Sequence, residues 1–546
     1  MSPDGNRVAF VWDDAGRQNP SLYALRVGTA QPTRLTHASA TETAPSWSPD
    51  GKTIAFVRTG PGSASIYTIA AEGGREQLVR DIYPIVTAQY GRYLDWSPDG
   101  KSLAVTLKKS MEEAGRLVLI PSGVTTAEAR PLTNPPVHAH CDSNPAYSPD
   151  GRYLAFMRTE RYSVTDIYIA PSSSDGTLRG AAQRVTFDNQ WIQGLTWTPD
   201  SKAIVFSSRR DGRQGLWRVR LDGVSAMQPV SMAGDDAMFP SAAKASPKLS
   251  YARLSQNQNI WRLEVARNGA APNPPKKLIA STQRQNGPQY SPDGRKIAFS
   301  SDRSGSMEVW VAEADGSSPT RLTFVDEGLA GLPRWSPRGD TIAFDRRTKS
   351  GHLCIFLIPA NGGSPRQLTD ASAEDSKPSW SHDGRWVYFS SNRTGRYQIW
   401  KIAAEGGSPV QVTQQGGHAP FESWDGKFVY YAKERISPAI WKVPVSGGEE
   451  QPVLESPRPK TWSYWALGPG GIYFLTQPDD SVFEGQSHSI MNFFNFQTRS
   501  SKQIAELHSP LLISTPGLAV STDGRYLLYP QIDEESGDLI LLENFQ

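Results

Sequence analysis

A short turn sequence, Ser-Pro-Asp-Gly, recurs along the whole chain and restricts the fold more than any other feature. Complete copies lie at Ser2–Gly5, Ser48–Gly51, Ser97–Gly100, Ser148–Gly151 and Ser291–Gly294. Degenerate copies begin at Thr198, Ser246, Ser336, Ser381, Ser423, Gly468 and Ser521. Together they make about twelve units with a period of roughly 42 to 53 residues, which is typical of β-propeller blades.

The residues between two turns follow the pattern of four short strands. In the unit Pro288–Thr323, Pro292 and Gly294 favour a hairpin, because proline presets φ and glycine supplies the positive φ that closes the turn. The apolar run Lys296–Phe299 then predicts a strand covered on both faces, and Glu308–Val311 begins a third strand. A fourth ends in the Leu-Thr pair that closes the unit. Four strands per repeat predict an all-β fold built of propeller blades.

The number of units is too large for one ring. A propeller usually has four to eight blades, so we expect two tandem β-propellers of about six four-stranded blades each. We place the division in the polar segment Ser281–Gly287, with one propeller in residues 1–283 and the other in residues 284–546; five plus seven blades would fit equally well. The chain opens inside a hairpin turn, so we expect the first blade to lack its innermost strand and Met1 to be a truncated or internal start.

The repeated unit resembles the TolB-like β-propeller repeat, a WD-like repeat. The resemblance rests on the Trp-Ser-Pro-Asp-Gly turn, the Ile-Ala-Phe strand, the Ile-Tyr or Ile-Trp strand and the Leu-Thr ending, and it covers essentially the whole chain. The order of units and the ending Leu541–Phe545 are similar to the C-terminal propeller array of bacterial regulators that begin with a winged-helix or Ser/Thr kinase domain. This likeness implies the sensory or regulatory part of a larger signalling or transcription-regulatory protein.

Charge and composition exclude several other classes. The formal net charge of +2 is far from the strongly basic footprint of a nucleic-acid-binding protein, so we expect no direct nucleic acid binding. Cys141 and Cys354 fall in different repeats and predict no disulfide framework. The chain has no signal-peptide-type leader and no apolar run that could cross a bilayer. We expect no membrane insertion and a cytoplasmic protein as encoded, or a periplasmic one where a natural upstream sequence supplies a leader or anchor.

Two groups of residues have the side chains of metal or catalytic sites, and a structural role is favoured for both. Aspartate in a hairpin turn accepts backbone N–H groups, which is reason enough for its recurrence. His138–Asp142 contains metal-ligand residue types, but a zinc site needs a third or fourth ligand that the sequence does not assign. We therefore predict no metal and no cofactor. The predicted structural turn residues are Asp50, Gly51, Asp99, Gly100, Asp150, Gly151, Asp293, Gly294, Asp383 and Gly384.

Catalytic motifs are missing from the sequence. A serine hydrolase of the type that accompanies such propellers needs a G-x-S-x-G elbow, and the nearest candidate, Gly485–Ser489, lacks the final glycine. Kinase signatures are absent too. We therefore expect a non-enzymatic module that binds a protein or peptide. The alternatives are an accessory propeller that filters substrates for a prolyl-oligopeptidase-like peptidase, or a periplasmic TolB-like envelope scaffold.

The segments between blades are the predicted partner-binding surface, because they converge around the central tunnel and vary while the turns stay constant. Most tryptophans recur at fixed repeat positions and predict packing between blades, whereas Trp191 and Trp462 fall outside these positions. We expect those two to be exposed contact residues. The full candidate set is Tyr90, His138, His140, Asp142, Gln190, Trp191 and Gln193 in the first ring, and Arg284, Asp326, Glu327, Asp375, Lys377, His418, Trp462 and Tyr464 in the second.

Overall fold

The regular secondary structure of the computed structural model consists almost entirely of β-strands. The structure describes the chain except residues 14–19, 61–62, 83–92, 109–112, 124–127, 137–138, 162–163, 188, 223–226, 266–272, 326–328, 436, 477–488, 508–516 and 546. In this part of the chain one short 3-10 helix, η1 (Ser231–Ala233), accompanies the strands. No helix described here is long and apolar enough to cross a membrane.

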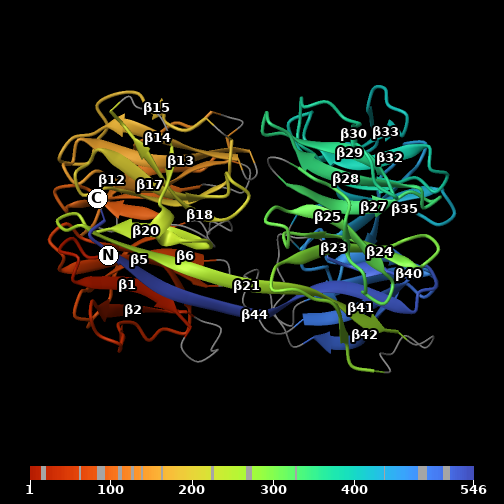
Figure 1. Cartoon of the computed structure of the whole chain (residues 1–546), viewed down its shortest axis with the longest axis horizontal. Coiled ribbons are helices and arrows are strands. Elements are labelled where there is room, and N and C mark those ends of the chain that lie inside the picture. The colour runs from red at the N-terminus through yellow and green to blue at the C-terminus, as the bar shows by residue number, and fades with distance from the viewer. Residues whose placement is uncertain are drawn as a thin grey trace. The chain divides into compact units, whose positions relative to one another are not determined.

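The first compact unit comprises Met1–Ser255 and Ser536–Gln546 (Figure 1). Its sheets follow chain order, so each blade is an antiparallel meander. The three-stranded blade is β1 (Arg7–Trp12), β2 (Ser21–Arg26) and β3 (Thr33–Arg34). The four-stranded blades are β4 (Thr41–Trp47), β5 (Thr53–Gly60), β6 (Ser63–Ala70) and β7 (Gln77–Ile82); β8 (Leu94–Trp96), β9 (Ser102–Leu107), β10 (Arg116–Pro121) and β11 (Arg130–Pro131); β12 (Cys141–Tyr147), β13 (Tyr153–Arg161), β14 (Val164–Pro171) and β15 (Gln183–Arg184); and β16 (Ile192–Trp197), β17 (Ala203–Ser208), β18 (Gly215–Arg220) and β19 (Gln228–Pro229).

The second compact unit is Gln256–Glu535, and it repeats the same blade. Its four-stranded sheets are β23 (Gln285–Tyr290), β24 (Lys296–Ser301), β25 (Glu308–Glu313) and β26 (Thr320–Arg321); β27 (Ala330–Trp335), β28 (Thr341–Arg347), β29 (Leu353–Pro359) and β30 (Arg366–Gln367); β31 (Asp375–Trp380), β32 (Trp386–Ser391), β33 (Gln398–Ala403) and β34 (Val410–Gln411); β35 (His418–Glu422), β36 (Phe428–Ala432), β37 (Ile440–Pro444) and β38 (Gln451–Leu454); and β39 (Trp465–Gly468), β40 (Gly471–Thr476), β41 (Ser489–Asn495) and β42 (Ser500–Leu507).

The sixth blade of each unit comes from one sheet that the two units share. In this sheet β20 (Ala237–Ala242), β21 (Lys248–Glu264), β44 (Tyr526–Glu543) and β43 (Ala519–Val520) are neighbours in that order, and β22 (Lys276–Ile279) pairs with β21. The division between the units falls inside both long strands. Two tandem β-propellers of six blades, as the repeats predict, are therefore confirmed.

The position of the domain boundary differs from the predicted one. The repeats predict a division between residues 283 and 284, whereas the structure divides the chain after Ser255 and returns Ser536–Gln546 to the first unit. The physical reason is the pairing of β21 with β44, which brings the C-terminal strand back. Phe545 then packs with Leu249 and Tyr251 in the first unit's core. A repeat count along the sequence contains no information about this exchange.

The recurrent turn is held by one hydrogen-bond pattern. In the turn before β5, the Ser48 hydroxyl donates to Asp50 Oδ1 at 2.6 Å, and that oxygen accepts the Lys52 N–H at 3.1 Å. Ser48 Oγ also accepts the Thr53 N–H at 3.0 Å, and Gly51 has a φ of 69°. The same bonds recur at Asp99, Asp150, Asp293 and Asp383, where Gly100, Gly151, Gly294 and Gly384 also have positive φ.

The Leu-Thr ending ties the fourth strand to the third. The Thr323 hydroxyl oxygen accepts the Val309 N–H at 2.9 Å, and the hydroxyl donates to Glu308 Oε2 at 2.5 Å. Thr186 makes the equivalent bonds to Ile167 and Asp166 in the first unit. This buried threonine thus satisfies a strand N–H where the short outer strand ends.

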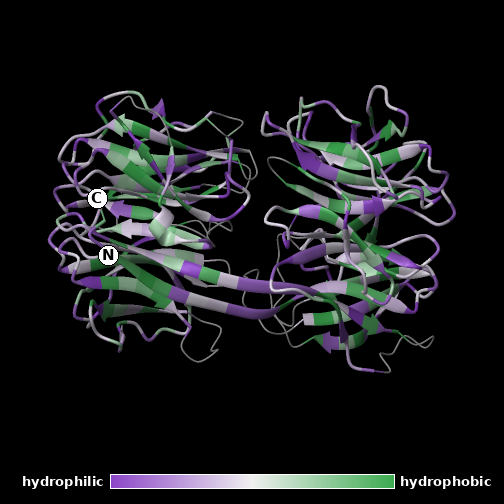
Figure 2. Cartoon of the chain, in the orientation of Figure 1, coloured by the Kyte–Doolittle hydropathy of each residue, from purple (hydrophilic) through white to green (hydrophobic). Residues whose placement is uncertain are grey.

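Apolar residues concentrate in the strands, and hydrophilic residues in the connecting loops and the middle of β21 and β44 (Figure 2). The tryptophans that precede the turns are buried or nearly so, as in Trp96 and Trp197. Those of the third strands are half-buried beneath a cation: the Arg303 guanidinium lies 5.1 Å from the Trp310 ring and that of Arg393 4.9 Å from Trp400. Both positions serve packing within and between blades.

Candidate functional site

A β-bulge interrupts the innermost strand in most blades. The register between the first and second strands shifts there by one residue, and the bulged residue has a positive φ. All but one of these residues precede a proline, which cannot donate to the ladder and is tolerated in a strand at such a bulge. The bulged residues are Ala44, Asn144, Gly194 and Phe239 in the first unit and Gly287, Leu332, Lys377 and Ala419 in the second.

The bulges of the second unit are anchored in the neighbouring blade. At three of these bulges the freed N–H donates to a buried side chain in the second strand of the preceding blade. Leu332 donates to Ser300 Oγ at 3.0 Å, Lys377 to Asp345 Oδ2 at 3.1 Å, and Ala419 to Ser390 Oγ at 3.2 Å. These bonds fix the innermost strand of one blade against the second strand of the preceding blade.

A pocket lies at the centre of the second unit, where these innermost strands meet. The space inside it that a water-sized molecule can occupy is about 20 Å³, and it opens to solvent. Its residues come from β27, β31, β35 and β39 and from the segments before β39 and β43, so five blades contribute. We call it the channel pocket; it is lined by Leu332, Arg334, Lys377, Pro378, Ala419, Pro420, Phe421, Trp462, Ser463, Trp465 and Leu518.

Lys377 is the charged residue among the bulge positions described above, and aromatic rings surround its ammonium group. Nζ lies 4.1 Å from the centroid of the Trp462 ring and 5.2 Å from that of Tyr397. His418 Nδ1 is 3.4 Å from the same nitrogen. The contact with the indole face partly replaces the water that this cation loses in the pocket.

Burial shifts the protonation equilibria of this group of residues. Loss of water lowers the pKa of Lys377 to about 7, helped by the nearby Arg435 guanidinium and opposed by Asp345. Burial likewise raises the pKa of Asp345 to about 6 and lowers that of Arg334 to about 10. The pKa of His418 is held well below its ordinary value by burial and then by the Lys377 charge, so its imidazole is neutral at pH 7.

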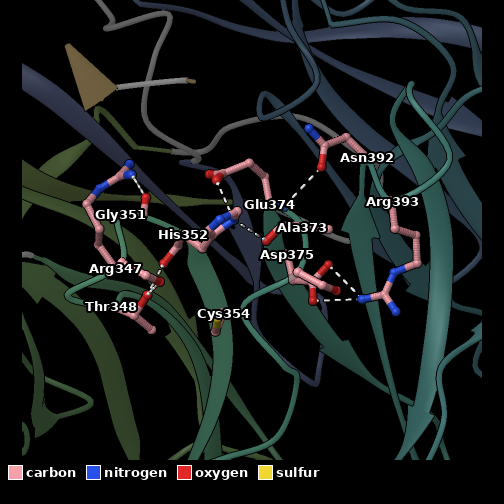
Figure 3. Close-up of polar contacts among 12 residues, drawn as sticks. Arg347, Thr348, Gly351, His352, Cys354, Ala373, Glu374, Asp375, Asn392 and Arg393 are labelled. Atoms are coloured by element: carbon pink, nitrogen blue, oxygen red, sulfur yellow. Dashed lines mark hydrogen bonds and ion pairs between the residues drawn. The ribbon is translucent and has the colours of Figure 1, made fainter. Parts of the chain in front are cut away.

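An ion pair and a histidine–carboxylate contact lie at the start of the strand that carries Lys377 (Figure 3). Asp375 is fully buried, and its Oδ2 accepts a hydrogen bond from Arg393 Nη2 at 2.8 Å. Glu374 is buried beside His352, whose Nδ1 is 3.4 Å from a Glu374 oxygen and 3.2 Å from the Ala373 carbonyl. A carbonyl can only accept, so Nδ1 carries the hydrogen. Within the described residues no cluster of three or more His, Cys, Asp or Glu side chains could hold a metal ion.

The structure brings together three of the predicted second-ring residues. Lys377, His418 and Trp462 form one cluster at the channel pocket. Asp375 is occupied by Arg393, and Arg284 pairs with Asp302 at 2.6 Å. Tyr464 is fully buried in a hydrophobic core. The expectation that Trp462 is exposed is wrong, since its exposed fraction is 5 %. Asp326 and Glu327 lie outside the described residues.

The candidates of the first ring do not form an equivalent cluster. Trp191 is exposed, with an exposed fraction of 36 %, and Gln190 is half-buried. Asp142 is fully buried and pairs with Arg158 at 2.7 Å, while Gln193 is buried in β16. His140 is half-buried, and its backbone N–H donates to the Thr159 carbonyl at 2.7 Å. Tyr90 and His138 lie outside the described residues.

Several pocket residues are absent from the sequence-based candidates. Leu332, Arg334, Ala419 and Phe421 line the pocket but lie inside innermost strands, whereas the predicted binding residues come from the segments between blades. The signal that could have found them is the proline that follows Leu332, Ala419 and Lys377, three residues or fewer before the hairpin turn. It marks the bulge in each blade.

Comparison with known proteins gives the family. The TolB beta propeller domain family (PD40) matches residues 1–134 and 326–484, which is more than half of the chain. The chain belongs to the TolB β-propeller family.

Individual TolB-like relatives differ in how much of their length is matched. The Agrobacterium fabrum protein Atu1656 is 25 % identical over 60 % of this chain and 92 % of its own length. The Tol-Pal system protein TolB of Francisella tularensis is 23 % identical, over 52 % of this chain and 53 % of the relative. The Bacillus subtilis peptidase YuxL is 26 % identical over 28 % of each. The chain thus spans about half of the TolB relative and about a quarter of the peptidase.

A solved TolB structure was also found. The crystal structure of TolB from Acinetobacter baumannii aligns with a TM-score of 0.36 and 14 % identity, covering 71 % of this chain and 81 % of the other.

Proposed function

We propose that this TolB-like chain is a non-catalytic module that binds a protein or peptide, and that the partner enters the channel pocket of the second unit. The observation that supports this most is the composition of the pocket, which combines indole and phenyl surfaces with the Lys377 ammonium at the meeting point of five blades. Aromatic and cationic side chains in a concave, rigid setting are the usual anchors of recognition.

The rigidity of the pocket favours binding of a flexible partner. The bulged N–H groups of Leu332, Lys377 and Ala419 are bonded to the preceding blades, so little order has to be created on the propeller side. The sensory or regulatory role in a larger bacterial protein rests on the sequence resemblance and stays a prediction.

Filling the pocket is the direct test. Peptides that bind the full chain are first selected from a displayed random library and then measured against two variants. Ala419→Trp fills the channel pocket, and Ala44→Trp makes the same change at a bulge of the first unit, where φ is 54° against 50° at Ala419. We expect at least a tenfold loss of affinity for Ala419→Trp and little change for Ala44→Trp. The proposal is overturned if Ala419→Trp binds as the wild type does.

A second candidate is the accessory propeller of a peptidase. The observation in its favour is the partial match to the Bacillus subtilis peptidase YuxL. Incubation of the pure chain with peptide and ester substrates tests what both proposals share, since any turnover by the chain itself contradicts a non-catalytic propeller.

A further inference from the structure

The channel pocket contains more positive than negative charge. Arg334 and Lys377 both line it, and neither makes an ion pair with a carboxylate among the residues that the structure describes. The Arg334 Nη1 donates to the Pro333 carbonyl at 2.9 Å and its guanidinium faces the Phe421 ring, while Lys377 Nζ contacts the His418 ring nitrogen and the aromatic faces of Trp462 and Tyr397. Cations removed from water in this way are costly unless an anion compensates them.

The groups that face Lys377 come from every blade packed against it. Asp345 of β28, Tyr397 before β33, His418 of β35 and Arg435 after β36 interact with the Lys377 side chain, and Arg334 of β27 lines the same pocket. Asp345 is the one carboxylate in this set, and its oxygen Oδ2 already accepts the Lys377 backbone N–H. Together with Lys377 itself, these groups comprise three cationic side chains, one carboxyl group, one phenol and a neutral imidazole.

We propose that the channel pocket recognises a carboxylate of the partner peptide, an Asp or Glu side chain placed between Lys377 and Arg334 with apolar neighbours against Trp462 and Phe421. The inference rests on the proposed function and adds the chemical class of the ligand. A carboxylate supplies the missing negative charge and accepts charge-assisted hydrogen bonds from both cations. A neutral peptide would leave both cations without a compensating negative charge.

Binding of the carboxylate is coupled to a proton. An adjacent anion favours the charged ammonium, so the Lys377 pKa rises from about 7 when the ligand binds. Below pH 7 the proton is already present. Above pH 7 it must be taken up, and affinity falls by up to about tenfold per pH unit until the pKa of the complex is reached.

The test uses two matched pools of capped peptides, derived from the sequences selected on the full chain. In one pool each peptide has a single Asp or Glu among apolar residues, and in the other Asn or Gln replaces it. We expect the wild-type chain to prefer the acidic pool at least tenfold at pH 6.5 and to lose most of that preference at pH 8.5. Lys377→Met should bind both pools equally at either pH. Lys401→Met, in the same blade with its ammonium 5.0 Å from the Trp386 ring, is the control and should behave as the wild type.

The outcomes separate this inference from the proposed function. If the wild type binds the two pools equally and Ala419→Trp binds neither, recognition of a carboxylate is overturned. The channel pocket then remains the docking site. An acidic preference that survives in Lys377→Met overturns the role of Lys377. Binding that Ala419→Trp does not weaken overturns the docking site itself.

Discussion

The Lys377 ammonium lies 4.1 Å from the centroid of the Trp462 indole ring. The two residues come from different blades, β31 and the segment before β39, and meet only because the ring closes. Lys377 reaches the pocket from a bulge with a φ of 59°, and the N–H that the bulge frees is bonded to Asp345. The contact therefore depends on the folding of the whole second unit. Substitution of either residue can be followed both in the stability of the unit and in its affinity for peptides.

Replacing Lys377 with methionine should stabilise the second unit at neutral pH. The unfolded chain holds the Lys377 proton up to a pKa of about 10.4, whereas the folded unit releases it at about 7. In that interval the unfolded state binds more protons, so the wild type's free energy of unfolding rises with pH, by at most ~1.4 kcal/mol per pH unit. Calorimetry between pH 6 and 10 should show the variant above the wild type at pH 7 by at least ~1 kcal/mol, with the gap closing towards pH 10. A constant gap would contradict the lowered pKa.

Asp142→Asn should destabilise the first unit by about 3 kcal/mol, because it leaves the Arg158 guanidinium without its buried partner. The distance between Arg158 Nε and Asp142 Oδ1 is 2.7 Å, and the Asp142 side chain is fully buried. Asp235→Asn is the control, since its pair with Arg213 is exposed and is worth less than about 1 kcal/mol. Urea unfolding of both variants checks this; equal midpoints would show that the buried pair adds no stability.

The repeats of the sequence predict the fold well because the hydrogen bonds of each turn join residues that are close in sequence. Ser48, Asp50 and Gly51 make their bonds within six residues, so the hairpin can be read locally. The shared sheet could not be read, since it depends on Asn257 lying beside Glu534. The pocket was predicted in part: Lys377 and His418 were found as residues between turns, but the burial of Trp462 depends on a ring closure that no local pattern encodes.

Thr323→Val should destabilise the second unit by about 1 to 3 kcal/mol, since the Val309 N–H loses its acceptor in a buried place. Glu308 also loses a donor, although its bond to the Val325 N–H at 2.8 Å remains. Thr320→Val, at an exposed position in the same outer strand, serves as the comparison and should change the midpoint of thermal unfolding little. Similar losses in the two variants would argue against the role given to the Leu-Thr ending.

Ala44→Gly should be neutral or stabilising although glycine is unfavourable in strands. Ala44 has a φ of 54°, and the strain of this left-handed conformation, about 1 to 2 kcal/mol, disappears in glycine. Ala55→Gly in β5, with no exposed surface, should instead lower the stability of the first unit. Unfolding curves that place both variants equally far below the wild type would contradict the strained bulge.

Photochemical cross-linking from inside each ring tests the docking site most directly. A photoreactive benzoylphenylalanine is placed at Leu332 in the channel pocket or, as the comparison, at the bulge residue Phe239 of the first unit. The full chain is illuminated with a peptide selected by its binding, and the cross-linked products are identified by mass spectrometry. We expect a peptide adduct from the Leu332 position and none from Phe239. An adduct from Phe239 alone would contradict it.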